Sequence, residues 1–311
     1  MSGAATVVAG RKRQASGALG PVALFALLGL GGWVLVWLPL FLVAAAFACR
    51  ALAHGARGRS ADLAVPAAFG FAVLAAWQAL CVGLAVPTVL LPPPSKIAAR
   101  LVEAGPILWA DFVQTFVRAV VPGWIMGCGL GFAAALACDR FDFLRRGLMP
   151  IGNFVSALPI IGIAPILVMW FGFDWPSKAA VVVVMTFFPM LVNTVAGLAA
   201  AGRLERDLMR SYGASWTQTL LALRLPAALP FVFNALKINA TLALIGAIVA
   251  EFFGTPIVGM GFRISTEVGR MALDMVWATI AVAALVGSAS YGLLALAERS
   301  ATFWHPSQRE R

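Results

Sequence analysis

The sequence predicts an all-α integral membrane protein, a polytopic bundle of six or seven transmembrane helices. Of its 311 residues, 61% are hydrophobic and only 12% are charged, about half the charged share of an ordinary soluble domain. The apolar residues also occur in long blocks, and about 20 such residues suffice to cross a bilayer. A soluble protein with so few charges could not cover its own surface, so a soluble fold is excluded.

The apolar blocks predict the membrane spans in order along the chain. The blocks long enough to cross a bilayer are approximately residues 21–48, 63–86, 112–137, 148–170, 178–200, 230–252 and 274–297. Gly and Pro interrupt several of them, which membrane helices tolerate because neighbouring helices satisfy the freed backbone groups. The block around Val181–Val184 is β-branched, but it is too long for a strand of a membrane barrel.

The distribution of Lys and Arg predicts which loops face the cytoplasm. The alternate loops 49–62, 138–147, 201–229 and the C-terminal tail hold 13 of these residues, against eight in the other set of loops and boundaries. Because cytoplasmic loops are enriched in Lys and Arg, the loop 201–229 and the C-terminus should be cytoplasmic. The net charge of +10 therefore reflects topology, and no nucleic-acid partner is expected.

We expect three parts along the chain. Residues 1–62 form an N-terminal extension with one extra hydrophobic helix, residues 63–297 form the transmembrane domain, and residues 298–311 form the cytoplasmic tail. The block 21–48 is either a tilted span or a span with an interfacial extension. We expect this block to be a peripheral helix, because a bundle of seven spans would place the basic run Arg11–Arg13 outside the cell. That position would conflict with the enrichment of Lys and Arg in cytoplasmic loops.

The loop before the 112–137 block carries two helix-start signals. Ser95 follows three prolines and stands where the N-cap of a short helix over 96–103 belongs. Asp111-x-x-Gln114 has the form of a capping box that opens the next span. A rigid external linker would account for these features on its own.

The loop 201–229 predicts a helix–turn–helix outside the membrane. Gly213 can adopt a positive φ and end the first helix, and Ser215-x-x-Gln218 is a capping box for the second. Pro226 and Pro230 should stop that second helix and restart the next span.

The same loop contains a spaced motif. Asp207-Leu208-Met209 is followed after three residues by Gly213, after nine more by Leu223, and then by Leu225-Pro226. This spacing resembles the Glu-Ala-Ala…Gly…Ile-x-Leu-Pro loop of binding-protein-dependent ABC importer permeases, with Asp207 in place of the Glu and two alanines replaced. The resemblance implies that the loop docks in a groove of an ATPase. The residues expected to couple the two are Asp207, Arg210, Tyr212, Gly213, Ala214, Trp216, Leu223, Leu225 and Pro226.

Other segments narrow the resemblance to one group of permeases over about residues 87–297. The segments similar to nitrate, taurine and alkanesulfonate importer permeases are Leu91–Ser95, Ala235–Ile238, Ala250–Gly254 and Gly259–Phe262. The stretch Glu251–Met271 and the tail Thr302–Ser307 resemble permeases for pyrimidine thiamine precursors or riboflavin. No residue chemistry selects a pyrimidine over a sulfonate.

The resemblance implies a type I importer permease that forms the pathway for a small organic solute or anion. The chain has no Gly-x-x-x-x-Gly-Lys-Ser/Thr motif, so it should not bind ATP by a P-loop and should be a transport subunit, not an enzyme. ATP would be used by a partner, and no cofactor is expected in this chain. The implied assembly has two ABC ATPase subunits, a second permease copy and a periplasmic or lipid-anchored substrate-binding protein in a bacterial inner membrane.

Four residues in or next to spans are candidates for the gate or pathway: Lys237, Asn239, Glu251 and Gly254. Charged groups inside spans are costly and are functional candidates by default. Lys237 fits either snorkelling to the cytoplasmic surface or pairing near the docking loop. Glu251 fits either an external gate or a place among lipid headgroups, and Asn239 fits either the pathway or an interhelical hydrogen bond.

Two other function classes are open to a polytopic chain. An ion-coupled secondary transporter would need coupling carboxylates or symmetric broken helices near the midplane, and no Asp or Glu lies in the middle of a predicted span. A membrane enzyme would need clustered His, Asp or Glu, and the carboxylates here are scattered. The secondary transporter is the stronger alternative, and no catalytic or metal-binding residue is predicted.

Overall fold

The computed structural model describes residues 59–156, 158–254 and 256–304, and the regular elements within these ranges are all helices. This confirms the all-α class, and five helices of the described part are long and apolar enough to cross a membrane. The predicted helix 21–48, the basic run Arg11–Arg13 and the end of the tail lie outside the described residues. The chain divides into two compact units, one reaching to Glu103 and including Met271–Trp277, the other holding Ala104–Arg270 and the residues from Ala278 on.

The first unit contains α2 (Arg59–Gly83), α3 (Pro94–Glu103) and the beginning of α13 (Leu273–Ala301). Gln78 of α2 donates its Nε2 to Ser95 Oγ and accepts the Ser95 N–H at its Oε1, both at 3.0 Å. The predicted N-cap role of Ser95 is therefore wrong, because α3 begins one residue earlier and the Ser95 hydroxyl contacts α2 instead.

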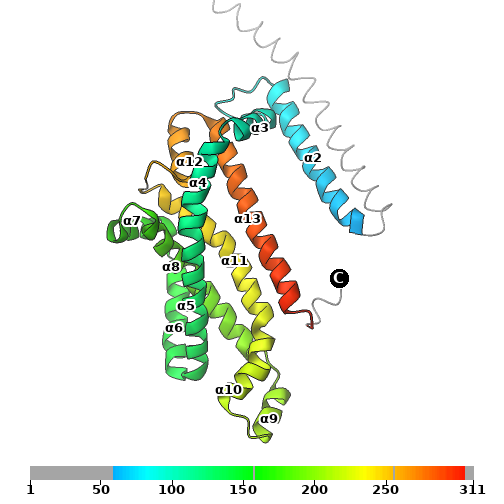
Figure 1. Ribbon diagram of the computed structural model, residues 1–311, viewed down its shortest axis with the longest axis vertical. Helices are drawn as coiled ribbons and strands as arrows, with labels where there is room; N and C mark the ends of the chain where they lie inside the picture. Colours follow the sequence, from blue (N-terminus) through cyan, green and yellow to red (C-terminus); the bar gives the residue numbers. More distant parts are fainter. Residues whose placement is uncertain (1–58, 157, 255, 305–311) are drawn as a thin grey trace, which may run out of the picture. The chain divides into compact units, whose positions relative to one another are not determined.

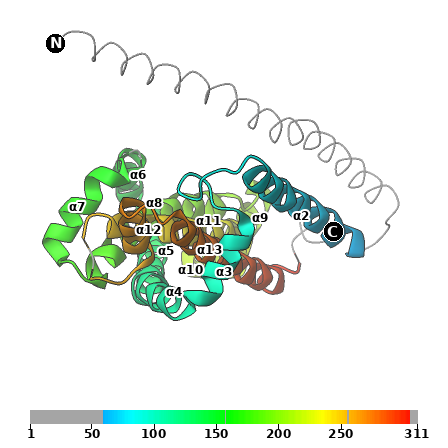
Figure 2. The ribbon, with the colours of Figure 1, turned by 90° about the horizontal axis from the view of Figure 1, so that it is seen from above.

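The second unit is built around α8 (Trp175–Ala199), which packs between α5 and α11. Figures 1 and 2 show these three helices side by side. Two of the spans are composite helical runs of 36 residues each, Gly105–Arg140 and Trp216–Glu251. The first run consists of α4 (Gly105–Phe112), η1 (Val113–Val120) and α5 (Val121–Arg140), and the second of α10 (Trp216–Thr219), η2 (Leu220–Arg224) and α11 (Leu225–Glu251).

Opposite ends of this unit carry different short helices. In Figure 1, α9 (Arg203–Ser211) and α10 lie at the lower end, whereas α4 and α12 (Met260–Gly269) lie at the upper end. At about 1.5 Å per residue, each composite run is about 54 Å long, longer than the hydrocarbon core of about 30 Å. The ends of both runs therefore extend beyond that core, where polar side chains are tolerated.

Small residues allow α5 to pack so closely against α8 that the backbones of the two helices are in contact. Gly123, Gly127 and Gly131 lie four residues apart on one buried face of α5, the spacing of small-residue helix interfaces in membranes. A Cβ on Gly123 would lie 2.7 Å from Val182 Cβ and 2.8 Å from Ala179 O. No larger residue fits on this face without moving α8.

Two π-helical segments interrupt the composite runs, and a proline follows each. In η1 the N–H of Val121 donates to Phe116 O, and in η2 the N–H of Leu225 donates to Leu220 O. Pro122 and Pro226 come next and have no N–H to donate, so the ordinary i→i−4 ladder cannot continue through them. The wider π turn keeps the helix continuous at both places.

The predicted stops at Pro226 and Pro230 are wrong for this reason. The chain continues as one helix from α10 through η2 into α11, with Pro226 in its first turn and Pro230 inside it. The second helix of the loop and the following span are thus a single rigid element.

The predicted span 148–170 differs in the structure. It is divided between α6 (Asp142–Ser156) and α7 (Ile160–Phe171), with Pro159 as the N-cap residue of α7. A residue before proline is disfavoured in the α region, so Leu158-Pro159 ends the first helix. Neither α6 nor α7 is long enough to count among the five spans.

We predict that Gly123→Ala destabilises the protein by about 1–3 kcal/mol, the usual cost of overpacking. Gly129→Ala is the matched control, because Gly129 lies on the same helix with nothing within 4 Å of an added Cβ. Thermal unfolding of the detergent-purified protein should show a lower midpoint only for Gly123→Ala. Equal midpoints would contradict the close α5–α8 contact.

Candidate functional site

The loop 201–229 folds as the predicted helix–turn–helix. Helix α9 ends at Ser211, and Gly213 in the turn that follows has a φ of +70° and donates its N–H to Arg210 O at 2.9 Å. Ser215 and Gln218 form the predicted capping box, with Gln218 N–H donating to Ser215 Oγ and Ser215 N–H to Gln218 Oε1. Local sequence chemistry therefore fixes both the turn and the start of α10.

One face of α9 exposes large apolar side chains. Leu204, Leu208 and Tyr212 follow each other at four-residue spacing and are 84%, 56% and 80% exposed. No residue of α9 is buried, and Asp207 and Arg210 form an exposed ion pair at 3.7 Å. Contiguous apolar exposure of this kind is typical of surfaces that contact another protein or a membrane.

The base of the loop is fixed by an ionic cluster, which we call the Asp139 clamp and define as Asp139, Trp216 and Arg224. Asp139 Oδ2 accepts from Trp216 Nε1 at 3.2 Å and from Arg224 Nη1 at 2.7 Å, while Oδ1 accepts from Arg224 Nη2 at 2.5 Å. Arg224 Nε also donates to Leu198 O at 3.1 Å. Arg140 lies over the Trp216 ring at 5.3 Å.

The other predicted coupling residues occupy two environments. Gly213 is exposed, whereas Ala214, Leu223, Leu225 and Pro226 are half-buried. The structure thus brings Trp216 and the Leu-Pro part of the motif to the base of the loop, and leaves Asp207 to Gly213 on its outer surface.

Lys237 forms an ion pair with Glu298 of α13. Its Nζ lies 2.6 Å from Glu298 Oε2, and both side chains are 14% exposed. The ammonium group also lies 5.8 Å from the ring centroid of Tyr291. Of the two predicted arrangements for Lys237 the structure shows a paired one, but the partner is on α13 and not in the loop 201–229.

Asn239 is fully buried where α5, α8 and α11 meet. Its Nδ2 donates to Thr186 O at 2.8 Å and to Cys128 Sγ at 3.3 Å. This is the interhelical hydrogen bond that was expected for an Asn within a span.

Glu251 ends α11, and its side chain is buried. It accepts from Thr115 Oγ1 at 2.8 Å and from the Gly261 N–H at 2.6 Å. Thr115 Oγ1 in turn accepts the Met260 N–H at 2.8 Å. Glu251 therefore joins η1 to the N-terminus of α12, where a carboxylate is favoured by the helix dipole.

Asp111 belongs to the same end of the unit and is fully buried. It accepts from the Gly259 N–H at 2.8 Å and from Arg263 Nε at 2.8 Å. The predicted Asp111–Gln114 capping box is wrong, because both residues lie inside the continuous helix 105–140 and their side chains bond to other segments. The hydrogen bond from Arg263 to Asp111 raises the pKa of this guanidinium, which lies outside the spans.

Gly254 lies in the turn after α11 with a φ of +153°. Its carbonyl accepts from Lys178 Nζ, which also donates to Phe173 O at 2.6 Å. Lys178 thereby ties the 171–177 loop to the turn after α11. All four gate or pathway candidates are thus engaged by groups of this chain, and their assignment to the pathway stays a prediction.

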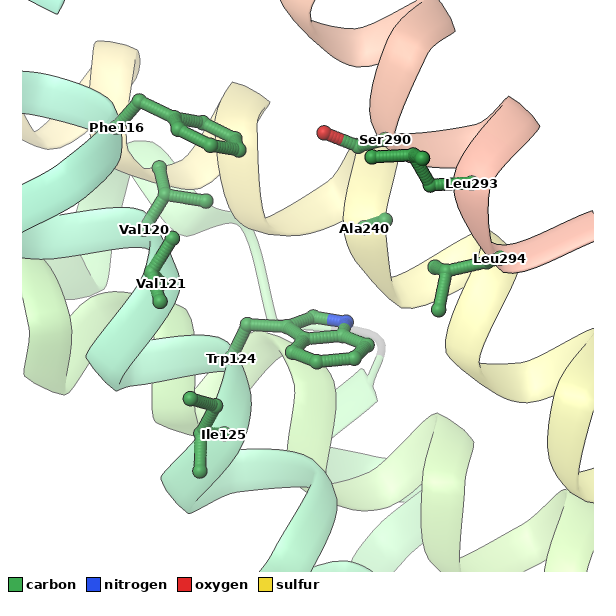
Figure 3. Close-up of a pocket in the computed structure, with 9 residues that line it drawn as sticks. All are labelled: Phe116, Val120, Val121, Trp124, Ile125, Ala240, Ser290, Leu293 and Leu294. Carbon is green, nitrogen blue, oxygen red and sulfur yellow. The ribbon is translucent and has the colours of Figure 1, made fainter. Parts of the chain in front are cut away.

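An apolar cavity of about 210 Å³ opens beside Trp124 (Figure 3). Phe116, Trp124 and Ser290 are among its lining side chains, from η1, α5 and α13. Its two polar groups are engaged within the chain, since Trp124 Nε1 donates to Leu236 O and Ser290 Oγ to Val286 O. The cavity therefore suits apolar groups and offers no free donor for a polar solute.

Sequence reasoning missed the partners that fix these residues. Asp139, Asp111, Thr115 and Glu298 lie between 61 and 152 residues from the groups they bind, so no local pattern reveals the pairing. The sequence shows that charged residues are rare near the apolar blocks, and this makes each of them a functional candidate. It does not show which residue each of them binds.

Comparisons with known proteins agree with this architecture. The sequence model of the family described as "Binding-protein-dependent transport system inner membrane component" matches residues 127–302. The riboflavin transport system permease protein of Chloroflexus aurantiacus is 29% identical over 76% of this chain and 88% of its own length. A probable ABC transporter permease protein of Haemophilus influenzae is 30% identical over 68% and 85%. The formylaminopyrimidine transport permease protein of Halalkalibacterium halodurans is 28% identical over 80% and 99%.

These matches confirm the predicted resemblance and the predicted function as a permease subunit. They do not favour the alternative of an ion-coupled secondary transporter. Together with the five apolar helices they identify a multi-pass membrane protein and a transport component. The chain belongs to the family of inner membrane components of binding-protein-dependent transport systems.

Proposed function

We propose that this permease is driven by a separate ATPase that docks on the coupling loop 201–229. The observation that carries the proposal is the apolar face of Leu204, Leu208 and Tyr212, which is exposed on a helix with no buried residue. An amphipathic helix that projects such a face is suited to lie in a groove of a partner. The remaining motif residues, from Asp207 to Pro226, set the shape and the anchoring of that helix.

We place the coupling loop and the C-terminus on the cytoplasmic side of a bacterial inner membrane. The hydrogen bonds support this arrangement, because they join loops that the basic-residue rule assigns to the same side. Trp216 of the 201–229 loop binds Asp139 of the 138–147 loop. At the other end, Asp111 of the 87–111 loop accepts the N–H of Gly259 of the 253–273 loop.

The complete importer is proposed to contain two copies of this permease, two ATPase subunits and a periplasmic or lipid-anchored binding protein. Its solute is proposed to be a pyrimidine thiamine precursor or a riboflavin-like compound, and a sulfonate, nitrate or taurine is the alternative. The similarity to permeases named for riboflavin and formylaminopyrimidine transport supports the first choice. Lys237, Asn239, Glu251 and Gly254 remain the candidates for the pathway.

The function is tested by reconstitution. Proteoliposomes that contain this chain, its ATPase and its binding protein should accumulate labelled riboflavin or formylaminopyrimidine only when ATP is supplied. Omitting the ATPase is the control and should abolish accumulation. Uptake by the permease alone under a proton or sodium gradient would contradict an ATP-driven importer.

The turn at Gly213 gives a prediction about docking. Gly213→Pro removes the N–H that binds Arg210 O and fixes φ near −65°, about the opposite sign of the observed +70°. The variant should reach the membrane but lose co-purification with the ATPase. Gly213→Asn, which tolerates a positive φ, should keep it. Unchanged co-purification of Gly213→Pro would show that the docking loop is misassigned.

The exposed face of α9 gives a second prediction about docking. Leu208→Glu should leave the fold intact, because Leu208 is 56% exposed, and should weaken ATPase binding about 30-fold, the effect of losing about 2 kcal/mol at an interface centre. Phe143→Glu is the control, since Phe143 is 87% exposed but lies on α6, outside the coupling loop. Binding measured by titration in detergent should separate the two. The same loss in both variants would argue against a specific contact.

A further inference from the structure

We propose that Asp139 is a positioning residue that transmits movement of the coupling loop to the spans. The proposal rests on the proposed docking of an ATPase to that loop. It assigns to the Asp139 clamp a mechanical role in transport, distinct from the docking contact itself.

The clamp joins three spans at one point. Asp139 lies at the end of the run 105–140, Leu198 lies at the end of α8, and Trp216 and Arg224 lie in the run 216–251. Arg224 bonds to two of these elements at once, through Asp139 on one side and Leu198 O on the other. A displacement of α10 therefore acts on α5, α8 and α11 together.

The geometry of the clamp resists reorientation. Arg224 and Asp139 meet in a two-pronged arrangement at 2.7 and 2.5 Å, and paired guanidinium–carboxylate bonds fix direction as well as distance. The side chains are only 16% and 9% exposed, so solvent screens the pair less than it would a surface pair. Arg224 is the last residue of the π turn 220–224.

The outer part of the loop has few other connections to the spans. Among the described residues, neither α9 nor α10 has a buried side chain. A separate apolar cluster lies at the base, where Leu198, Leu220 and Ala228 are buried against Leu136 and Trp216. Because that cluster does not depend on the carboxylate, a variant at Asp139 can loosen the clamp while the helices stay packed.

The first test follows the relative motion of the loop and α6 and needs no transport substrate. Spin labels at Ser211→Cys on α9 and Phe143→Cys on α6 are placed in a cysteine-free permease bound to its ATPase. With the clamp intact, the label distance should stay the same with and without ATP, because the loop moves with the end of α5 and α6 follows α5 after a single residue. In Asp139→Asn it should change on ATP binding.

The second test measures coupling. In the reconstituted importer, Asp139→Asn and Arg224→Lys should retain ATPase co-purification and ATP hydrolysis but carry about fivefold less riboflavin or formylaminopyrimidine per ATP, the lower range of coupling between sites. The double variant should be no worse than the single ones, since each of them already breaks the same Asp139–Arg224 pair. Glu267→Gln is the matched control, because Glu267 is 12% exposed in an ion-pair cluster on α12 and should leave the ratio unchanged.

The outcomes separate the two proposals. If the wild-type permease fails to bind the ATPase, or Leu208→Glu binds it normally, the docking proposal fails. If docking is intact and Asp139→Asn keeps both the constant label distance and the full solute-to-ATP ratio, the clamp proposal alone is overturned. Loss of ATPase binding in Asp139→Asn would also overturn it, because Asp139 would then act in docking.

Discussion

The second unit depends on backbone-close packing of α5 and α11 against α8. Lipid tails are as apolar as the side chains of the spans, so apolar surface alone gives these helices no reason to associate. What remains is close van der Waals contact, and Gly123 on α5 and Gly197 on α8 remove the side chains that would prevent it. A Cβ on Gly197 would lie 2.8 Å from Phe231 Cβ. With α8 held on both sides, the polar groups at its two ends can meet partners from distant parts of the chain.

Those polar groups determine which helix ends belong together. At one end the Asp139 clamp gathers the coupling loop with α5 and α8, and at the other Glu251 and Asp111 gather α12 with the run 105–140. The run 216–251 connects the two, since it starts at Trp216 and ends at Glu251. An unpaired charge in such surroundings is expensive, so each cluster constrains register as well as neighbours. The few charged residues carry more information about the fold than the apolar majority does.

The sequence predicted correctly those parts of the structure that depend on residues close together in the chain. The class follows from block length, and Gly213 and the Ser215–Gln218 box follow from local backbone chemistry. The break at Pro159 was missed because membrane helices tolerate prolines, as Pro150 and Pro165 inside α6 and α7 show. The site was predicted as a surface loop, but its anchoring was not, because Asp139 and Arg224 are 85 residues apart in the chain and only the packed helices bring them together.

The π turn at 220–224 limits how the chain length can vary. A π turn amounts to one extra residue in an α-helix, and each residue turns an α-helix by about 100°. Deleting one residue here would remove that extra residue and leave a regular helix through 216–251, with α10 keeping about the same direction around the axis of α11. A deletion within the regular part of α11 would instead rotate α10 and everything before it by about 100°, and Trp216 would then face away from Asp139. The π turn is therefore the place where this run can lose a residue without changing the direction in which the whole loop 201–229 points.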